Sequence, residues 1–420
     1  MMSDRNDKTD NHFAGCLKMK KVPRFRPSLS WETMGVVFKK MFLGKDKNAI
    51  NRFETLFARY IGVQNAIAVP SGRIGLYLIL KHLGLKKGGE VLVPSFTYWV
   101  IPQIVSLLNL KPVFVDIDLH TCNLDISLLE EKITKNTKAI IPTHLYGLPC
   151  EMDFIVEIAK KYNLFVIEDC VQSCGAKYQN RFLGSIGEAG YFSFDITKTL
   201  SLMGGGMITT NNEELARKIK KDVAIYSFLT KRGVFKKILK TTAMKISTNP
   251  YIFSLLVFPL IRFFYRLDLD IVNKIFSEKK SLSLESLKSH LKLMPPEIQC
   301  ELGRRQLKVL NKRIKIRRKN GNYLLARLKG EKNITLPVDP QKNIFTNFPI
   351  RTAQRELLVT KLLGKGIDVS KGYMDALGDS PKAKILVKEI LHIPIYPFLK
   401  EKELAHIAET VKNVSRELNL

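Results

Sequence analysis

The sequence is short of acidic residues. Its 420 residues contain 39 Asp and Glu against 68 Lys and Arg, a formal net charge of +29. Such an excess favours anionic partners such as phosphates, nucleic acids or anionic lipids. The excess is uneven, because residues 231–320 hold 22 basic and 6 acidic residues, a net of +16. More than half of the charge therefore belongs to one basic region.

Cysteine is also scarce. The six cysteines are scattered, and the two nearest neighbours, Cys170 and Cys174, are separated by three residues. This spacing does not support a zinc site, and it indicates reduced, buried thiols in a reducing compartment. The first sixteen residues are polar and lack the apolar core of a signal peptide. We therefore expect a cytoplasmic protein without a bound metal.

The apolar run Tyr251–Leu267 is too short and too interrupted to cross a bilayer. It contains Pro259 and Arg262, whereas a spanning helix needs about 20 apolar residues. Basic flanks would let the region 231–288 lie peripherally on the inner, anionic face of a membrane. Alternatively, its apolar residues pack on the protein or at a subunit interface. No recognised nucleic-acid module accompanies the basic residues, so we expect no nucleic-acid partner.

Seven short apolar runs alternate with helix-like stretches in the first half of the chain. Near-continuous apolar strands that alternate with helices predict an α/β fold with a mostly parallel sheet, covered on both faces. The seven runs are Ala66–Val69, Glu90–Val93, Pro112–Ile117, Ala139–Pro142, Leu164–Glu168, Tyr191–Phe194 and Gly206–Thr210.

The rest of the chain follows a different pattern. The length allows two packed units. Glu297–Leu328 has the composition of a long basic helix, and Phe345–Leu420 that of a compact α/β unit. We predict an N-terminal segment (1–45), a large domain (46–224), a basic and apolar helical insert (225–288) and a small C-terminal domain (289–420).

Candidate site residues follow the predicted strands, because ligands bind at the carboxyl ends of strands in such sheets. Ser71, Gly72 and Arg73 open a helix after the first run. Backbone N–H groups at a helix N-terminus suit a phosphate, although such turns are also common connections. Tyr98 follows the second run, where its ring could stack on a planar ligand or simply pack in the core.

Two carboxylates, Glu168 and Asp169, end a fully apolar strand. A buried charge is costly without a partner, and a cationic ring nitrogen would be one. Gln172 could add a hydrogen bond to the same ligand. The alternative is that Asp169 only caps the following helix.

Lys198 stands between the strand that ends near Ser193 and three consecutive glycines, Gly204–Gly206. A desolvated lysine has a lowered pKa and can form a Schiff base, whereas most lysines are simply solvated charges. Ser193 could bind a phosphate, and the glycines would allow close approach of the backbone. A lysine, a carboxylate, a phosphate cup and a stacking ring are together the requirements of pyridoxal 5'-phosphate.

Several ordered motifs resemble the DegT/DnrJ/StrS family of sugar aminotransferases. They include "VPSGRIGLYLILKHLGLKKGGEVLVPSFTY", "LFVIEDCVQSCGAKY" and "LGSIGEAGYFSFDITKTLSLMGGGMITTNNEEL". The similarity runs from about Phe53 to Lys220 and resumes from about Glu297. It implies the fold-type-I, aspartate-aminotransferase-like architecture, with a large cofactor domain and a smaller α/β C-terminal domain.

The resemblance also implies a reaction and a set of roles. The protein would convert a keto sugar on a nucleotide or lipid diphosphate to an amino sugar, with glutamate as donor, for cell-surface polysaccharide or secondary-metabolite biosynthesis. It would work as a homodimer; the alternative is a non-catalytic regulator or membrane-associated scaffold. The implied roles are the Schiff-base lysine (Lys198), the partner of the pyridine nitrogen (Asp169), a residue near the ring hydroxyl (Gln172), the phosphate cup (Ser193 with the backbone of Gly72 and Arg73) and the stacking aromatic (Tyr98).

The sequence departs from the family pattern at two places. Arg73 stands where the family usually has a threonine after Ser-Gly. The family's "GxNxRM" stretch, whose Asn reaches the neighbouring subunit's cofactor phosphate, corresponds here to "SHLKLMPPEIQ" at 289–299, which has neither Asn nor Arg.

Overall fold

A seven-stranded sheet forms the centre of the computed structural model, which describes residues 21–42, 48–267, 293–294, 297–336, 341–372 and 374–419. All seven apolar runs become strands of this sheet, as predicted. Only β10 runs antiparallel to its neighbours, so the sheet is mostly parallel. The strand order is β1 (Asn65–Val69), β10 (Gly206–Thr210), β9 (Ala189–Ser193), β6 (Phe165–Asp169), β5 (Thr137–Ile140), β2 (Glu90–Pro94) and β4 (Lys111–Val115).

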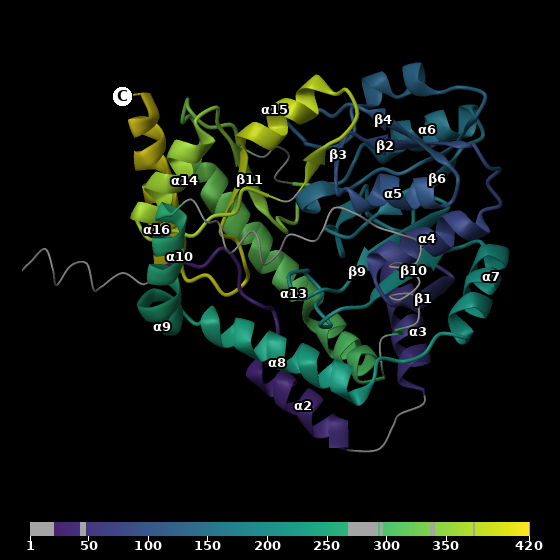
Figure 1. The fold of residues 1–420 in the computed structure, drawn as a ribbon, viewed down its shortest axis with the longest axis horizontal. Coiled ribbons are helices and arrows are strands. Elements are labelled where there is room, and N and C mark those ends of the chain that lie inside the picture. Colours follow the sequence, from purple (N-terminus) through teal and green to yellow (C-terminus); the bar gives the residue numbers. More distant parts are fainter. Residues whose placement is uncertain are drawn as a thin grey trace, which may run out of the picture.

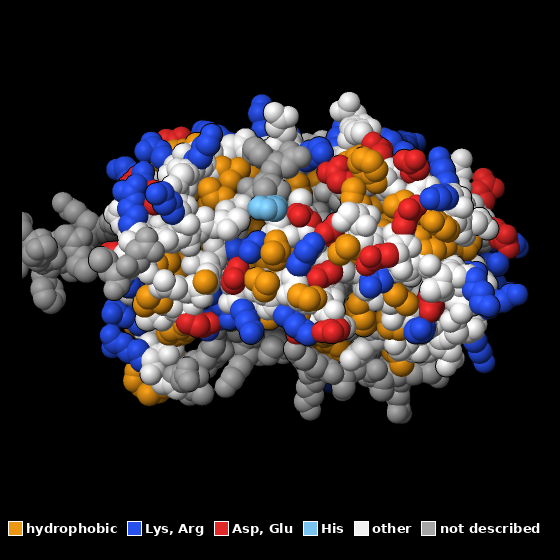
Figure 2. All heavy atoms as spheres, turned by 90° about the horizontal axis from the view of Figure 1, so that it is seen from above, with side chains coloured by type: hydrophobic (Ala, Val, Ile, Leu, Met, Phe, Trp, Pro, Cys, Tyr) orange, Lys and Arg blue, Asp and Glu red, His pale blue; other side chains and the backbone are white. Residues whose placement is uncertain are grey.

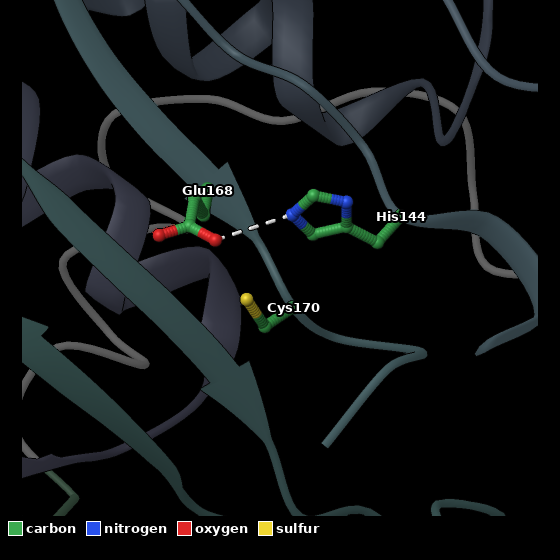
Figure 3. A group of neighbouring side chains, drawn as sticks. All are labelled: His144, Glu168 and Cys170. Carbon is green, nitrogen blue, oxygen red and sulfur yellow. Dashed lines mark ion pairs between the residues drawn. The ribbon is translucent and has the colours of Figure 1, made fainter. Parts of the chain in front are cut away.

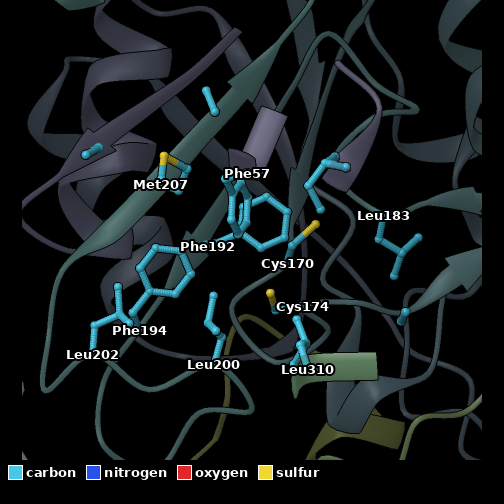
Figure 4. Packing of buried hydrophobic residues seen from close by; sticks show 14 of the residues in the cluster. Phe57, Cys170, Cys174, Leu183, Phe192, Phe194, Leu200, Leu202, Met207 and Leu310 are labelled. Atoms are coloured by element: carbon cyan, nitrogen blue, oxygen red, sulfur yellow. The ribbon is translucent and has the colours of Figure 1, made fainter. Parts of the chain in front are cut away.

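Helices cover both faces of the sheet (Figure 1). Side chains of neighbouring strand residues point to opposite faces, so Phe192 packs into one apolar cluster and Tyr191 into the other. Figure 4 shows the first cluster around Phe192, Phe57 and Phe194. It contains residues of α3 (Ala49–Ile61) and α6 (Met152–Lys161), whereas the second contains residues of α4 (Gly72–His82), α5 (Val100–Leu107) and α7 (Glu213–Ala224).

The long basic helix is present as α13 (Glu297–Leu328), with the predicted bounds. Its first half contributes Leu310 to the core on the sheet, and its end contributes Leu324 to a separate core. That second core belongs to the C-terminal unit, so α13 connects the two (Figure 1). The unit comprises β11 (Phe348–Arg351), α14 (Arg355–Gly364), α15 (Pro381–Glu389), β13 (Ile390–Ile393) and α16 (Glu401–Arg416).

Three short segments form the described part of the predicted insert. They are α8 (Lys231–Ser247), α9 (Pro250–Ile252) and α10 (Phe258–Arg266), the last two joined by a π-helical turn at Phe253–Val257. α8 lies beside α2 (Trp31–Phe42) at the bottom of Figure 1. Residues 268–288 of the insert lie outside the described residues, and the predicted domain limits remain predictions.

No single described helix is long and apolar enough to cross a membrane. The bent pair Lys231–Ser247 and Pro250–Arg266, with 63° between its halves, meets the length and composition requirement only as a pair.

The remaining elements are short. They are β3 (Phe96–Thr97) paired with β12 (Asp375–Ala376), β7 (Lys177–Tyr178) paired with β8 (Arg181–Phe182), and 3-10 turns at Ile126–Leu128, Glu130–Lys132, Leu145–Gly147 and Glu417–Asn419. The described cysteines are free and buried, as expected: Cys122, Cys150, Cys170, Cys174 and Cys300.

Candidate cofactor site

Asp169 and Lys198 face the same space at the carboxyl edge of the sheet. Asp169 is the last residue of β6, and Lys198 lies in the loop five residues after β9 ends at Ser193. β6 and β9 are parallel neighbours, so their carboxyl ends meet. Burial raises the pKa of Asp169, and the positive charge of Lys198 is one of the neighbouring influences that oppose this rise. The structure thus brings together the two residues on which the sequence prediction depends most.

The two adjacent carboxylates have different tasks. Glu168 is fully buried and accepts hydrogen bonds from the backbone N–H groups of Gly184, Ile186 and Gly187 at 2.7 to 2.9 Å. These bonds fix the loop that leads into β9 and occupy both carboxylate oxygens. Glu168 is therefore a structural residue, and Asp169 is the carboxylate left for a ligand.

Asp169 is buried, but its hydrogen bonding is incomplete. Its Oδ1 accepts one bond, from the N–H of Val171 at 3.0 Å. Within the described residues the hydroxyl of Tyr191 is a nearby donor that favours the charged carboxylate, but it forms no hydrogen bond of normal length. Burial raises the pKa of Asp169; the Val171 bond and the neighbouring Tyr191, His144 and Lys198 oppose that rise. No helix begins directly after Asp169, so helix capping does not explain this carboxylate. A protonated ring nitrogen would supply a hydrogen-bond donor for Oδ2.

His144 follows β5 and lies beside Glu168 and Cys170, a neighbour that the sequence analysis missed (Figure 3). Its Nδ1 accepts the N–H of Cys150 at 3.0 Å, and its Nε2 lies 3.4 Å from Oε2 of Glu168. His144, Glu168 and Cys170 could geometrically hold a metal ion. However, Glu168 is already saturated, and burial raises the pKa of the Cys170 thiol well above its usual range. We therefore interpret this group as a support for Asp169.

The backbone is closely packed at the start of α4. Gly72 is buried there, and a Cβ added to it would lie 3.2 Å from Cβ of Ser193. A Cβ on Gly206 would lie 2.6 Å from the carbonyl oxygen of Phe192 and 2.8 Å from the N atom of Gly72. Only glycine fits at 206, and the predicted phosphate-binding residues Gly72 and Ser193 are neighbours.

The glycine-rich loop after Lys198 is held by side chains from two distant elements. Met203, Gly204 and Gly205 all have positive φ, a conformation that favours glycine. Lys237 of α8 donates from Nζ to the carbonyl oxygen of Met203 at 2.9 Å. Gln299 of α13 donates from Nε2 to the carbonyl oxygens of Leu202 at 2.6 Å and Gly204 at 3.4 Å.

Gln172 links the site to the C-terminal unit. Its side-chain Oε1 accepts the N–H of Tyr146 at 3.1 Å. Its own carbonyl oxygen accepts the hydroxyl of Thr346 at 2.7 Å, and that hydroxyl lies 3.3 Å from Oγ1 of Thr199, next to Lys198. Thr346 precedes β11, so both units of the protein border the site.

The other predicted residues lie at the same edge with less defined roles. Tyr98 follows β3, and its ring centroid lies 5.6 Å from that of Trp99; stacking on a ligand remains a prediction. Arg73 is the second residue of α4 and is half-buried. The stretch 289–299 lies mostly outside the described residues. The effect of its missing Asn and Arg on the site therefore stays a prediction.

Pyridoxal phosphate fits the residues that are present. In the described part of the chain, the hydroxyls of Thr97, Thr143 and Ser201 are buried without a hydrogen-bond partner. Thr97 ends β3, Thr143 follows β5, and Ser201 lies in the loop that contains Lys198. Buried polar groups normally have partners, so these hydroxyls are consistent with a site that binds a polar ligand. Fold and site together define a protein of the fold-type-I, pyridoxal-phosphate-dependent class.

The chain belongs to the DegT/DnrJ/EryC1/StrS aminotransferase family, whose sequence model matches residues 36–247 and 279–412. Residues 248–278, which include α9 and α10, fall between the matched ranges. Pyridoxal phosphate is the cofactor that this membership implies.

Three similar proteins illustrate the range of the family. GDP-perosamine synthase of Escherichia coli O157:H7 is 40% identical over 47% of this chain and 55% of its own length. The matched part thus spans about half of that relative. A "Pleiotropic regulatory protein" of Geobacillus stearothermophilus is 28% identical over 87% of this chain and 89% of its own. The solved structure of S. venezuelae DesV in complex with a ketimine intermediate is 25% identical, with a TM-score of 0.73 over 94% of this chain and 99% of its own.

Proposed function

We propose that this protein is a pyridoxal-phosphate-dependent aminotransferase that converts a keto sugar, carried on a diphosphate, to an amino sugar. The observation that carries the proposal is that Lys198 and Asp169 lie at one edge of the sheet, close enough for the charge of Lys198 to act on the buried carboxylate.

The roles of the chain's residues follow from their positions. The cofactor supplies an aldehyde that binds amino groups and a ring that accepts the electron pair left when a carbon–hydrogen bond breaks. Lys198 would bind that aldehyde through Nζ and, once displaced by the donor amine, would carry the proton as general base and acid. Asp169 would accept a hydrogen bond from the ring nitrogen at Oδ2 and so keep that nitrogen protonated.

The remaining predicted residues would hold and orient the cofactor. Ser193 and the N–H groups of Gly72 and Arg73 would bind the phosphate at the positive end of α4. Gln172 would lie near the ring hydroxyl, with its position set by the bond from Tyr146. Tyr98 would stack on the ring face.

The substrate class rests on the relatives and on charge. GDP-perosamine synthase shares the matched half of this chain, and its name points to a GDP-linked sugar. A net charge of +29 suits any diphosphate carrier, whether nucleotide or lipid. We propose glutamate as amino donor and a homodimer as the working form, both by analogy with the family.

The test is a screen of nucleotide-linked keto sugars with glutamate. Release of 2-oxoglutarate together with a new amino sugar, detected by mass spectrometry, is the expected result for at least one GDP- or dTDP-linked 4-keto or 3-keto sugar. Lys198→Ala should abolish both products. If the wild-type protein holds the cofactor but aminates none of these sugars, the substrate assignment is wrong.

A non-catalytic regulator is the second candidate, because the similarity to the "Pleiotropic regulatory protein" extends over most of both chains. Intact Lys198 and Asp169 favour an enzyme instead. A protein that takes up no pyridoxal phosphate and releases no 2-oxoglutarate would support the regulator.

A further inference from the structure

We propose that α8, α9 and α10 form a docking surface for an anionic phospholipid bilayer, at the inner face of the membrane. On α8, Phe235, Leu239 and Ile246 are exposed at spacings of four and seven residues. These spacings place them on one face of the helix. That face is apolar and points away from the protein.

The second half of the surface is more apolar. Leu256, Leu260 and Phe263 are 64%, 57% and 56% exposed, and their spacings of four and three residues again define one face. Side chains of this size are rarely grouped on the exposed surface of a monomeric protein without a partner.

The charge of the segment identifies the partner. Residues 231–267 contain eight Lys and Arg and no Asp or Glu. An apolar face bordered by basic residues is typical of helices that lie in the interface of an anionic membrane. Figure 2, in contrast, shows a face of the molecule, away from α8, where acidic and basic side chains intermingle.

The opposite side of the segment is fixed to the protein. Val234 and Ile238 of α8 pack into the core on the sheet, whereas Phe253 and Phe258 pack into the core of the C-terminal unit. One face of each helix is therefore committed to protein contacts. The segment can lie on a bilayer with its other face, but it cannot span one without losing these contacts.

A basic groove next to the apolar face suits a lipid headgroup. The groove has a volume of about 260 Å³ and is lined by Lys21, Arg262 and Arg266 together with Phe258, Pro259 and Phe263. Three cations around an apolar floor match a phosphodiester whose acyl chains continue into apolar surroundings. Within the described residues no carboxylate pairs with these three side chains.

A second copy of the chain is a poorer occupant. In a two-fold symmetric dimer the same patch meets itself, so the basic side chains that border the patch would face one another. Apolar burial would then be opposed by repulsion without any acidic residue in the segment to offset it. The membrane proposal does not depend on the proposed reaction. The reaction is assigned through the family, and α9 and α10 lie in the range that the family model does not match.

Vesicle flotation of the full-length, cofactor-loaded protein tests the proposal. We expect binding to vesicles with about one third phosphatidylglycerol and little binding to pure phosphatidylcholine. Raising salt from about 0.1 M to about 0.5 M should weaken binding by screening. Trp31, exposed beside α8 with Nζ of Lys245 5.1 Å from its ring, should show a blue-shifted emission on binding. Trp31→Phe separates this signal from that of buried Trp99.

Matched variants locate the surface. Arg262→Gln with Arg266→Gln should weaken binding about tenfold or more, because each basic residue contributes about 1 kcal/mol near an anionic surface. Leu256→Glu with Leu260→Glu should remove binding at both salt concentrations. The exposed controls Lys86→Gln with Lys87→Gln, and Phe154→Glu, should bind as the wild type does.

The proposal fails if the protein ignores anionic vesicles, binds both vesicle types equally, or loses binding equally in the controls. It also fails if Leu256→Glu with Leu260→Glu leaves vesicle binding intact but converts a dimer to a monomer in light scattering. That result would assign the face to a contact between copies. Aminotransferase activity in solution should not change in these variants, so the failure of this proposal and that of the proposed reaction are distinguishable.

Discussion

Lys237 Nζ donates a hydrogen bond to the carbonyl oxygen of Met203 at 2.9 Å and so ties α8 to the glycine-rich loop. Burial lowers the pKa of Lys237, while the nearby Asp195 opposes that shift. The ammonium group is thus held close to the loop that carries Lys198, although it belongs to an element far away in the sequence. We regard Lys237 as a positioning residue for this loop.

Lys237→Met keeps most of the side-chain volume and removes the donor. We expect cofactor affinity and kcat to fall roughly tenfold, because small displacements of catalytic groups are costly, while the fold is retained. Fluorescence titration of the cofactor and steady-state kinetics measure the two effects. Lys237→Arg should recover part of the loss, and the exposed Lys240→Met on the same helix should resemble the wild type. Equal effects of Lys237→Met and Lys240→Met would contradict the positioning role.

Replacing the two adjacent carboxylates should separate function from stability. Asp169→Asn should reduce turnover by about 100-fold or more, because the ring nitrogen loses its anionic partner. Glu168→Gln should instead destabilise the fold by about 3 kcal/mol, because an amide NH₂ group cannot accept the backbone bonds that Glu168 accepts. Activity assays and chemical unfolding give the two readings. A stable, inactive Glu168→Gln protein would reverse the assignment.

Asp169 also predicts a pH dependence of the cofactor-free protein. Because burial raises its pKa in the folded state, the folded state binds this proton more tightly than the unfolded state does. The free energy of unfolding therefore decreases as pH rises from the unfolded pKa, about 3.9, through the raised folded value. An asparagine at position 169 cannot ionise. The melting temperature of the Asp169→Asn protein should therefore exceed that of the wild type at pH values above this range and approach it at pH values below the range. A difference independent of pH would contradict this explanation.

Gly72 of the predicted phosphate cup and the neighbouring Gly206 should respond differently to alanine. Gly206→Ala would place Cβ within 2.8 Å of three backbone atoms, so we expect a loss of about 2 kcal/mol or more in the free energy of unfolding. Gly72→Ala meets its neighbours at 3.1 Å or beyond and should keep the fold. Its cofactor affinity should still fall, because the methyl group enters the space next to Ser193. Thermal shifts with and without pyridoxal phosphate distinguish the two outcomes.

The sheet could be predicted from the sequence because its strands are nearly continuous apolar runs, and all but the edge strand β4 are largely buried. The carboxyl-edge rule then placed Asp169, Gln172, Ser193 and Lys198 correctly relative to the strands. The long helix α13 was also predicted with its observed bounds. These features depend on local patterns, which a single sequence contains.

Contacts between distant segments could not be predicted in this way. Lys237 and Thr346 border the site from an insert and from the C-terminal unit, and no local motif marks either of them. Gln299 of the long helix is the last residue of the stretch 289–299, which the family pattern singles out only for its missing Asn and Arg. His144 follows a predicted strand and could have been found by applying the carboxyl-edge rule to that strand as well. The tasks of Glu168 and Asp169 differ only because the loop at 184–187 folds over one of them.

The most direct test of the proposed chemistry is to trap the cofactor on the protein. Borohydride reduction of the pyridoxal-phosphate-loaded enzyme, followed by proteolysis and mass spectrometry, identifies the lysine that binds the aldehyde. We expect one pyridoxyl modification, on the peptide that contains Lys198, and none at that position in Lys198→Ala. A modification on another lysine, or no modification of a protein saturated with the cofactor, would contradict the account.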